Sequence, residues 1–231
     1  SAALSCNPLS THRILNEIPA VSANESADYY TGDIAKCKQR VLEVATLSYT
    51  DVIRELKTPL EAHLYCTEHL RHAGINVDSE IYGQGDYWAS FKEIHKNGRD
   101  DCDGGAIAAA SILIDDGFPP HILLIEGSSS THAVFIYRNK EGKYGSIGIN
   151  KQDYILPTLD SPSKLAEKLS ESVGLKPLEG YEIFNMNHFH PDFIFNDINN
   201  DPRREWYKFL SFELCSYLLV TKMKRFIYTI Y

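Results

Sequence analysis

The sequence is poor in cysteine and has no long apolar run. Its five cysteines are too few and too scattered for a disulfide framework, and their odd number leaves at least one thiol free even if the others pair. The longest apolar runs, such as 106–114, fall well short of the roughly 18 residues that a membrane-spanning helix needs. We therefore expect neither a disulfide-stapled scaffold nor a membrane span.

Excess positive charge and nucleotide-binding motifs are also missing. The formal net charge of −8 repels a phosphate backbone, so we expect no nucleic-acid partner. The basic cluster in the tail is diluted by acidic and apolar residues, which indicates a solvated helix face. It consists of Arg203, Arg204, Lys208, Lys222, Lys224 and Arg225. Gly83 and Gly85 mark a turn rather than a phosphate loop, and we expect no cofactor.

The composition is that of an ordinary globular domain, with 43% hydrophobic and 23% charged residues. Residues 1–30 are rich in Ser, Ala and Asn and are expected to form an N-terminal arm. Residues 31–231 are expected to form a single domain with its core at about 85–175 and a helical C-terminal extension from Asp201. The cellular compartment stays open, with the cytoplasm slightly favoured over secretion, and so does the oligomeric state.

Apolar spacing, caps and turn residues predict helices first and strands later. Helices are expected at 33–56, 58–74, 101–116 and 161–174, strands at 121–126, 131–138 and 143–150, and a short extended piece at 75–82. The second helix opens with a capping box from Thr58 to Glu61, and Glu141 and Gly142 form a turn between two strands. Helices followed by an antiparallel meander are typical of the α+β class rather than of a parallel α/β sheet.

Cys102 lies in the first turn of the helix that Asp100 or Asp101 caps, within the segment GRDDCDGGAIAAAS. Unpaired backbone N–H groups and the positive end of the helix dipole favour a thiolate there and can stabilise an oxyanion. The small residues that follow, such as Gly105 and Ala106, leave room for a strand to approach closely. The position also suits a buried, unreactive cysteine, so a basic group near the sulfur is what would indicate a nucleophile.

His132 is the candidate for that basic group. It opens the expected strand 131–138 after a Ser-rich loop, so its imidazole stands at the edge of a strand. From an edge, an imidazole can reach the mouth of the cysteine-bearing helix and act as a general base toward the thiol. A histidine alone in such a place is usually structural, and the nearby Cys102 is what favours the functional interpretation.

A third residue is expected to orient the imidazole. Asn150 ends the following strand and would lie beside His132, because the two strands meet at a tight turn midway between these residues. Asp153 is the rival, since its charge would stabilise an imidazolium better. The side chain that would complete an oxyanion hole stays unassigned among Gln84, Tyr87 and Trp88.

Three segments, GRDDCDGGA, HAVFIYR and GKYGSIGIN, resemble the cysteine, histidine and aspartate blocks of transglutaminase-like, papain-like cysteine hydrolases. The similarity is greatest to bacterial transglutaminase-like cysteine peptidases, whose blocks have this order and length, and it covers roughly 85–175. It implies a central helix with the catalytic cysteine at its start, packed on an antiparallel sheet. It also implies a catalytic triad of Cys102, His132 and Asn150. Transglutaminase-like proteins usually have Asp at the position of Asn150, whereas papain-like peptidases have Asn.

The expected activity is cleavage of an amide, peptide or isopeptide bond in a protein or peptide substrate through a thioester. With water as acceptor the chain is a peptidase, amidase or deamidase, and with a lysine amine it is a transglutaminase or another acyltransferase. We rank hydrolysis first because the resemblance is to peptidases. A non-catalytic binding module that keeps the fold is the alternative from another class.

Two further groups of residues look like metal sites. The first consists of His63, Cys66, His69 and His72. Its spacing of three spreads the four side chains over half the circumference of one helix, so they cannot all bind the same ion. The second group, within 188–192, lacks a fourth ligand. We therefore expect no bound metal.

Overall fold

The computed structural model describes residues 18–21, 28–72, 74, 77–83, 87–128 and 130–186. Its fold is α+β, as the order of elements predicts, with helices first and a five-stranded antiparallel sheet later in the chain. Most of the expected N-terminal arm and all of the expected extension from Asp201 lie outside the described residues. Within the described part, no helix combines the length and apolar character that crossing a membrane requires.

The sheet has the strand order β6-β5-β4-β3-β7, and each neighbouring pair is antiparallel. Its strands are β3 (His121–Gly127), β4 (Thr131–Arg138), β5 (Tyr144–Ile147), β6 (Ile155–Leu159) and β7 (Leu178–Asn185). The sequence predicts the three central strands, although β5 ends before Asn150. It misses the two edge strands. Pro157 in β6 and Gly180 in β7 weaken the strand signal, and edges are where a sheet tolerates proline.

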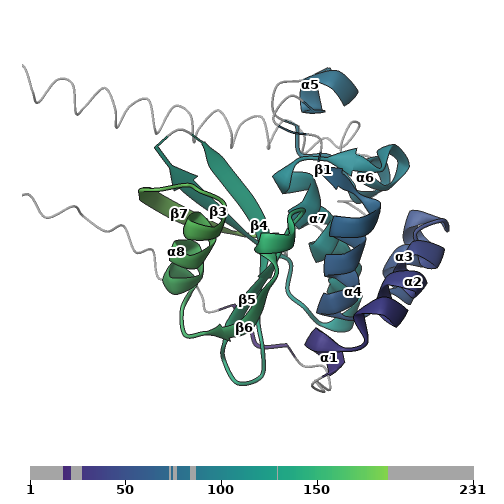
Figure 1. The fold of residues 1–231 in the computed structure, drawn as a ribbon, viewed down its shortest axis with the longest axis horizontal. Coiled ribbons are helices and arrows are strands. Elements are labelled where there is room, and N and C mark those ends of the chain that lie inside the picture. The colour runs from purple at the N-terminus through teal and green to yellow at the C-terminus, as the bar shows by residue number, and fades with distance from the viewer. Residues whose placement is uncertain are drawn as a thin grey trace, which may run out of the picture.

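Two helices cover the two faces of the sheet, as Figure 1 shows: α7 (Cys102–Leu113) lies on one face and α8 (Pro162–Ser172) on the other. On β4, Ala133 and Phe135 pack in the core cluster that contains α7, whereas Val134 packs in the cluster that contains α8. This alternation is the one expected of a strand that is buried on both faces.

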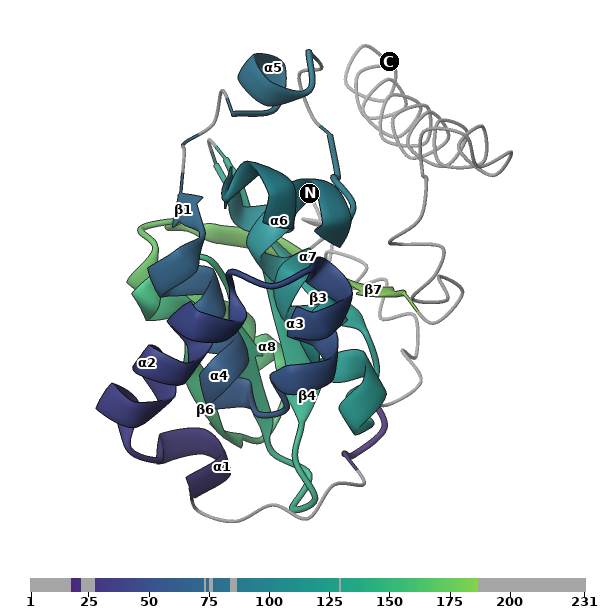
Figure 2. The ribbon, with the colours of Figure 1, turned by 90° about the vertical axis from the view of Figure 1, so that its right-hand side faces the viewer.

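The remaining helices lie around α7 (Figure 2), where α3, α4 and α6 pack against it and α2 packs against α4. They are α1 (Asp28–Thr31), α2 (Ile34–Val44), α3 (Tyr49–Glu55), α4 (Pro59–Leu64), a π-helix (Tyr65–His69), α5 (Val77–Ile81) and α6 (Phe91–Asn97). Two short strands, β1 (Arg71–His72) and β2 (Arg99–Asp100), pair in parallel beside them. The 3-10 turns Ile114–Asp116 and Lys151–Asp153 complete the described elements.

Three sequence predictions in this helical part are wrong in detail. The helix expected at 33–56 is two helices, because Ser48 caps α3 by accepting a hydrogen bond from the backbone N–H of Asp51. The helix that begins at Pro59 ends at His69 instead of Gly74, and the piece expected to be extended at 75–82 contains α5. The capping box from Thr58 to Glu61 is confirmed.

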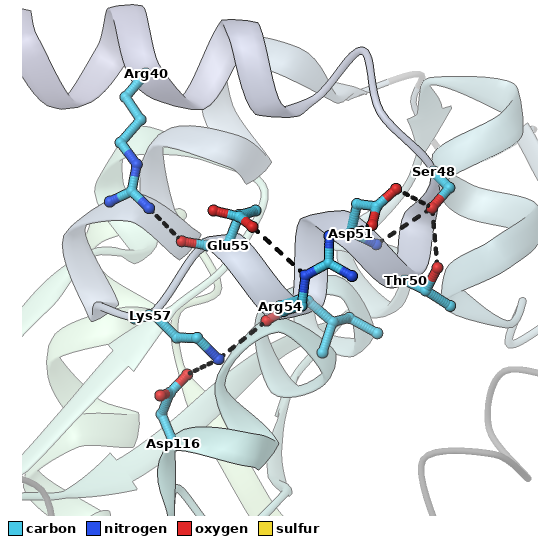
Figure 3. A network of polar contacts seen from close by, with 9 residues as sticks. Arg40, Ser48, Thr50, Asp51, Arg54, Glu55, Lys57 and Asp116 are labelled. Atoms are coloured by element: carbon cyan, nitrogen blue, oxygen red, sulfur yellow. Dashed lines mark hydrogen bonds and ion pairs between the residues drawn. The ribbon is translucent and has the colours of Figure 1, made fainter.

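Polar contacts between helix ends hold the outer helices in place (Figure 3). The guanidinium of Arg40 in α2 donates to the backbone oxygen of Glu55 in α3 at 2.5 Å. The ammonium of Lys57 donates to the backbone oxygen of Ile53 at 3.5 Å and lies 3.4 Å from the carboxylate of Asp116, which follows α7. These contacts fix α2 and α3 relative to α7, the helix that carries Cys102.

Candidate active site

Cys102 is the first residue of α7, and its side chain is half-buried. Asp101 is the N-cap of this helix, because its side chain accepts a hydrogen bond from the backbone N–H of Asp103 at 3.3 Å. The helix start therefore lies where the sequence predicts it. The sulfur is thus beside first-turn N–H groups that have no partner within the helix.

The other two described cysteines have surroundings that disfavour reactivity. Cys66 is fully buried in the π-helix, its thiol donates to the backbone oxygen of Gly105 at 3.5 Å, and burial raises its pKa. Burial and the charge of Glu61 also raise the pKa of Cys37. Cys66 and Cys37 therefore provide internal references for the reactivity of Cys102.

Two glycines in the first turn of α7 let other segments come close to the site. A Cβ atom on Gly105 would lie 2.6 Å from Cβ of Ile149 and 2.8 Å from its backbone nitrogen. A Cβ atom on Gly104 would overlap the carboxyl group of Asp100. The glycines thus admit the segment that follows β5 directly onto the helix, and that segment leads to Asp153.

His132 is the second residue of β4, close to the predicted place, and is buried. Its Nε2 atom lies 2.8 Å from Oδ1 of Asp153, and the interaction with Cys102 is among those that raise the pKa of the imidazole. Because Nε2 is directed to the carboxylate, Nδ1 is the ring nitrogen left for the sulfur. The structure therefore brings together Cys102, His132 and Asp153 from three separate parts of the chain.

The side chain that hydrogen-bonds the imidazole is that of Asp153, the rival of Asn150 in the sequence analysis. The backbone N–H of Asn150 donates to Oδ2 of Asp153 at 2.9 Å, so Asn150 acts on the carboxylate through its main chain. The hydroxyl of Ser146 donates to the backbone oxygen of Asp153 at 2.7 Å. A Cβ atom on Gly148 would lie 2.5 Å from Oδ2, so this glycine leaves room for the carboxylate.

The charge of this group favours a protonated imidazole. Burial lowers the pKa of His132, but the hydrogen bonds and the negative charges of Asp153 and Cys102 outweigh it and raise the pKa from 6.5 to about 10. His132 is therefore an imidazolium at neutral pH when the sulfur beside it is a thiolate. A cation next to sulfur stabilises the thiolate, which is the nucleophilic form of cysteine.

The acidic residues before Cys102 carry less negative charge than fully ionised carboxylates would, so they destabilise a thiolate less. The carboxyl group of Asp100 is completely buried, and its Oδ2 accepts a hydrogen bond from the hydroxyl of Tyr82 at 2.9 Å. Burial raises the pKa of Asp100 to about 7, although hydrogen bonds from Asp101 and Tyr82 act in the other direction. Asp100 is therefore partly neutral near pH 7.

None of the three candidates for an oxyanion side chain is placed at the sulfur by a described contact. The hydroxyl of Tyr87 donates to Glu93 at 3.3 Å, and the indole of Trp88 packs edge-on against Phe184 of β7. Gln84 lies outside the described residues. The sequence could not have chosen among them, because that choice depends on contacts between elements.

The histidines of the first possible metal site have separate partners and are not arranged around a common ion position. His63 stacks on Tyr154 at 4.2 Å, His69 lies against Tyr65 at 4.9 Å, and His72 is in β1 rather than on the helix. The group within 188–192 lies outside the described residues.

Among the described residues, two acidic groups have ligand atoms within 4.8 Å of one another, and both contain Asp101. They are Asp101 with Cys102 and Asp103, and Asp78 with Asp100 and Asp101. The three-carboxylate group offers the oxygen ligands that Ca²⁺ and Mg²⁺ prefer. The expectation of no bound metal stays a prediction.

Comparison with known proteins identifies no family for this chain, so the chemistry of the site residues is the basis for inferring its function. A scan of the chain against models of protein families finds no matching family, and a search of curated proteins finds no relative.

Proposed function

We propose that this chain is a cysteine hydrolase of the transglutaminase-like, papain-like type that cleaves an amide or peptide bond in a protein or peptide. Cys102 is the nucleophile, His132 carries the proton, and Asp153 orients the imidazole. The observation that carries the proposal is the buried His132, which hydrogen-bonds Asp153 and whose pKa is raised by both Asp153 and Cys102. A thiol at a helix start that shares an imidazole with a carboxylate is the arrangement that nucleophilic catalysis by cysteine requires.

The reaction begins with the Cys102 thiolate beside the His132 imidazolium. The sulfur attacks the carbonyl carbon, the C–S bond forms, and the π electron pair moves to the oxygen, where first-turn N–H groups of α7 stabilise it. When the electron pair returns, the C–N bond breaks and His132 gives its proton to the leaving amine. Water then attacks the thioester carbon while His132 takes a proton from the water, the C–O bond forms, and the C–S bond breaks with its electron pair returning to the sulfur of Cys102. The products are a carboxylic acid and the regenerated ion pair.

Asp153 suits its role better than Asn150 because a carboxylate opposite an imidazolium carries the complementary charge. The 2.8 Å hydrogen bond also fixes which ring nitrogen is left for the sulfur. Asn150, whose contact with the carboxylate is a backbone N–H, is expected to tolerate loss of its side chain.

Alkylation by iodoacetamide tests the proposal without knowledge of the substrate. We expect Cys102 to be alkylated much faster than Cys37 or Cys66 in the native protein. His132→Ala is expected to lower the rate at Cys102 by about 100-fold. Asp153→Asn should lower it less, and Asn150→Ala should leave it near the wild-type value. Mass spectrometry of digested protein measures all three cysteines in one sample.

Two results would contradict this assignment. Equal alkylation of Cys102 and Cys37, unchanged in His132→Ala, would favour a non-catalytic binding module that keeps the fold. A larger loss of the Cys102 alkylation rate in Asn150→Ala than in Asp153→Asn would assign the orienting role to Asn150. Partition of the acyl group from an activated ester between water and an added primary amine then separates hydrolysis from acyl transfer.

A further inference from the structure

His72 lies next to the chain segment that leads into Cys102. It is in β1, which pairs in parallel with β2, and it is directly opposite Asp100 in that pair. The backbone N–H of Arg71 donates to the oxygen of Gly98 at 3.0 Å, so this pairing extends to the turn before β2. His72 thus lies one strand away from a residue that precedes Cys102 by two positions.

The strand register indicates on which side of the β1–β2 pair the side chain of His72 lies. Residues directly opposite in a strand pair carry their side chains on the same face, and the carboxyl group of Asp100 lies against Gly104 in the first turn of α7. The charges of His132 and Asp153 both act on His72. Register and electrostatics therefore agree that the imidazole is near the catalytic pair.

His72 keeps its hydrogen-bonding capacity for a ligand. In the described part of the chain its side chain makes no hydrogen bond or ion pair and it is exposed. His95, by contrast, uses both ring nitrogens, with Tyr65 and with the backbone oxygen of Leu47. Although the side chain is exposed overall, partial desolvation of the ring and the charge of His132 lower the pKa of His72, with Asp153 acting in the other direction. This shift favours the neutral ring, which has one N–H donor.

We propose that His72 is a catalytic residue that donates this N–H to the substrate carbonyl oxygen while Cys102 attacks the carbonyl carbon. The inference rests on the proposed function and supplies the oxyanion donor that Gln84, Tyr87 and Trp88 leave unassigned. The donor keeps its proton throughout: the C–S bond forms, the π pair moves to oxygen, and the hydrogen bond strengthens as negative charge develops. The backbone N–H of Cys102 is the second donor.

The experiment compares two reactions of the same sulfur. Acylation by p-nitrophenyl acetate passes through an oxyanion, whereas alkylation by iodoacetamide is a direct displacement that forms none. His72→Phe keeps an aromatic ring but has no donor, and His72→Gln keeps an N–H donor. His69→Gln, three residues earlier in the π-helix, is the matched control. We expect His72→Phe to lower kcat for acylation by about 100-fold, with little change in KM or in alkylation rate.

Each outcome has a distinct meaning. Rescue of kcat in His72→Gln and normal kinetics in His69→Gln support the proposal. Unchanged acylation in His72→Phe overturns it, and so does an equal loss of acylation and alkylation in a folded variant, because His72 would then act on the sulfur. Fast alkylation of wild-type Cys102 without any acylation also overturns it. If Cys102 alkylates no faster than Cys37 in the wild type, the proposed function itself is wrong.

Discussion

The helices α7 and α8 pack on opposite faces of one sheet but differ in composition. In α7 every residue from Asp103 to Leu113 is buried, and most of them are glycine or alanine. In α8 only Leu165, Ala166, Leu169 and Ser170 are buried, which is one side of an ordinary amphipathic helix. Both helices have a side-chain N-cap and both cover the sheet, so these features do not set them apart.

The difference indicates what each helix does. A helix with large side chains keeps its axis away from its neighbours, whereas small residues let backbones meet. Gly105 lets the segment after β5 pack onto α7, and this segment leads to Asp153, which contacts His132. The α8 face contributes apolar burial and no described contact to Cys102. We therefore expect changes in α7 to alter reactivity and changes in α8 to alter stability alone.

The largest expected effect is on the pH dependence of stability and comes from Asp100, beneath the start of α7. Its pKa is about 7 in the folded protein against an ordinary value of 3.8, so folding favours its protonated form. This contribution is complete below pH 4 and is lost as pH rises through 7, which amounts to at most about 4 kcal/mol. Asp100→Asn should flatten the stability profile between pH 4 and 7, as measured by urea unfolding. An identical slope in both proteins would contradict the burial argument.

Leu169→Ala in α8 should be the next largest change. Leu169 is fully buried in the cluster on the α8 face of the sheet. Loss of this side chain is expected to lower the free energy of unfolding by about 3 kcal/mol. The alkylation rate of Cys102 in the folded variant should stay at the wild-type value. A change in that rate would show that the two faces are coupled.

Gly105→Ala in α7, unlike Leu169→Ala, should slow the alkylation of Cys102 as well as lower stability. The added methyl group would meet the backbone of Ile149, which costs about 2 kcal/mol in a packed core and exceeds the gain in helix propensity of about 1 kcal/mol. Displacement of the segment that leads to Asp153 should slow alkylation of Cys102 well beyond the change in stability. Ala166→Gly in α8 is the control, with reduced stability and unchanged alkylation.

The smallest expected effects come from the two N-caps. Ser161, the N-cap of α8, accepts from the backbone N–H of Lys164, and Ser161→Ala should cost about 1 kcal/mol without affecting alkylation. Asp101→Asn keeps a capping oxygen in α7 but removes a negative charge within 4.8 Å of Sγ of Cys102. It should leave stability nearly unchanged and speed alkylation at low salt several-fold. Equal alkylation rates in wild type and Asp101→Asn would mean that this charge does not reach the sulfur.

The local features of the chain could be predicted from neighbouring residues. The caps Thr58 and Asp101, the start of α7 and the presence of β4 with His132 near its start all follow from signals within a few positions. The break at Ser48 was missed because the apolar spacing continues across it. The strand β1 was missed because two residues are too few for a periodic signal, and its pairing with β2 is set by tertiary contacts.

The sequence by itself determined that a cysteine begins a helix of small residues and that a histidine begins a nearby strand. Only the tertiary structure decided that Asp153 rather than Asn150 contacts His132. A 3-10 turn follows Asn150, and it is Asp153 at the end of this turn whose carboxylate reaches the imidazole. The tertiary structure also decided that His72 leaves the helix and pairs beside Asp100. Such choices depend on distances between segments far apart in the chain, and no local spacing encodes them.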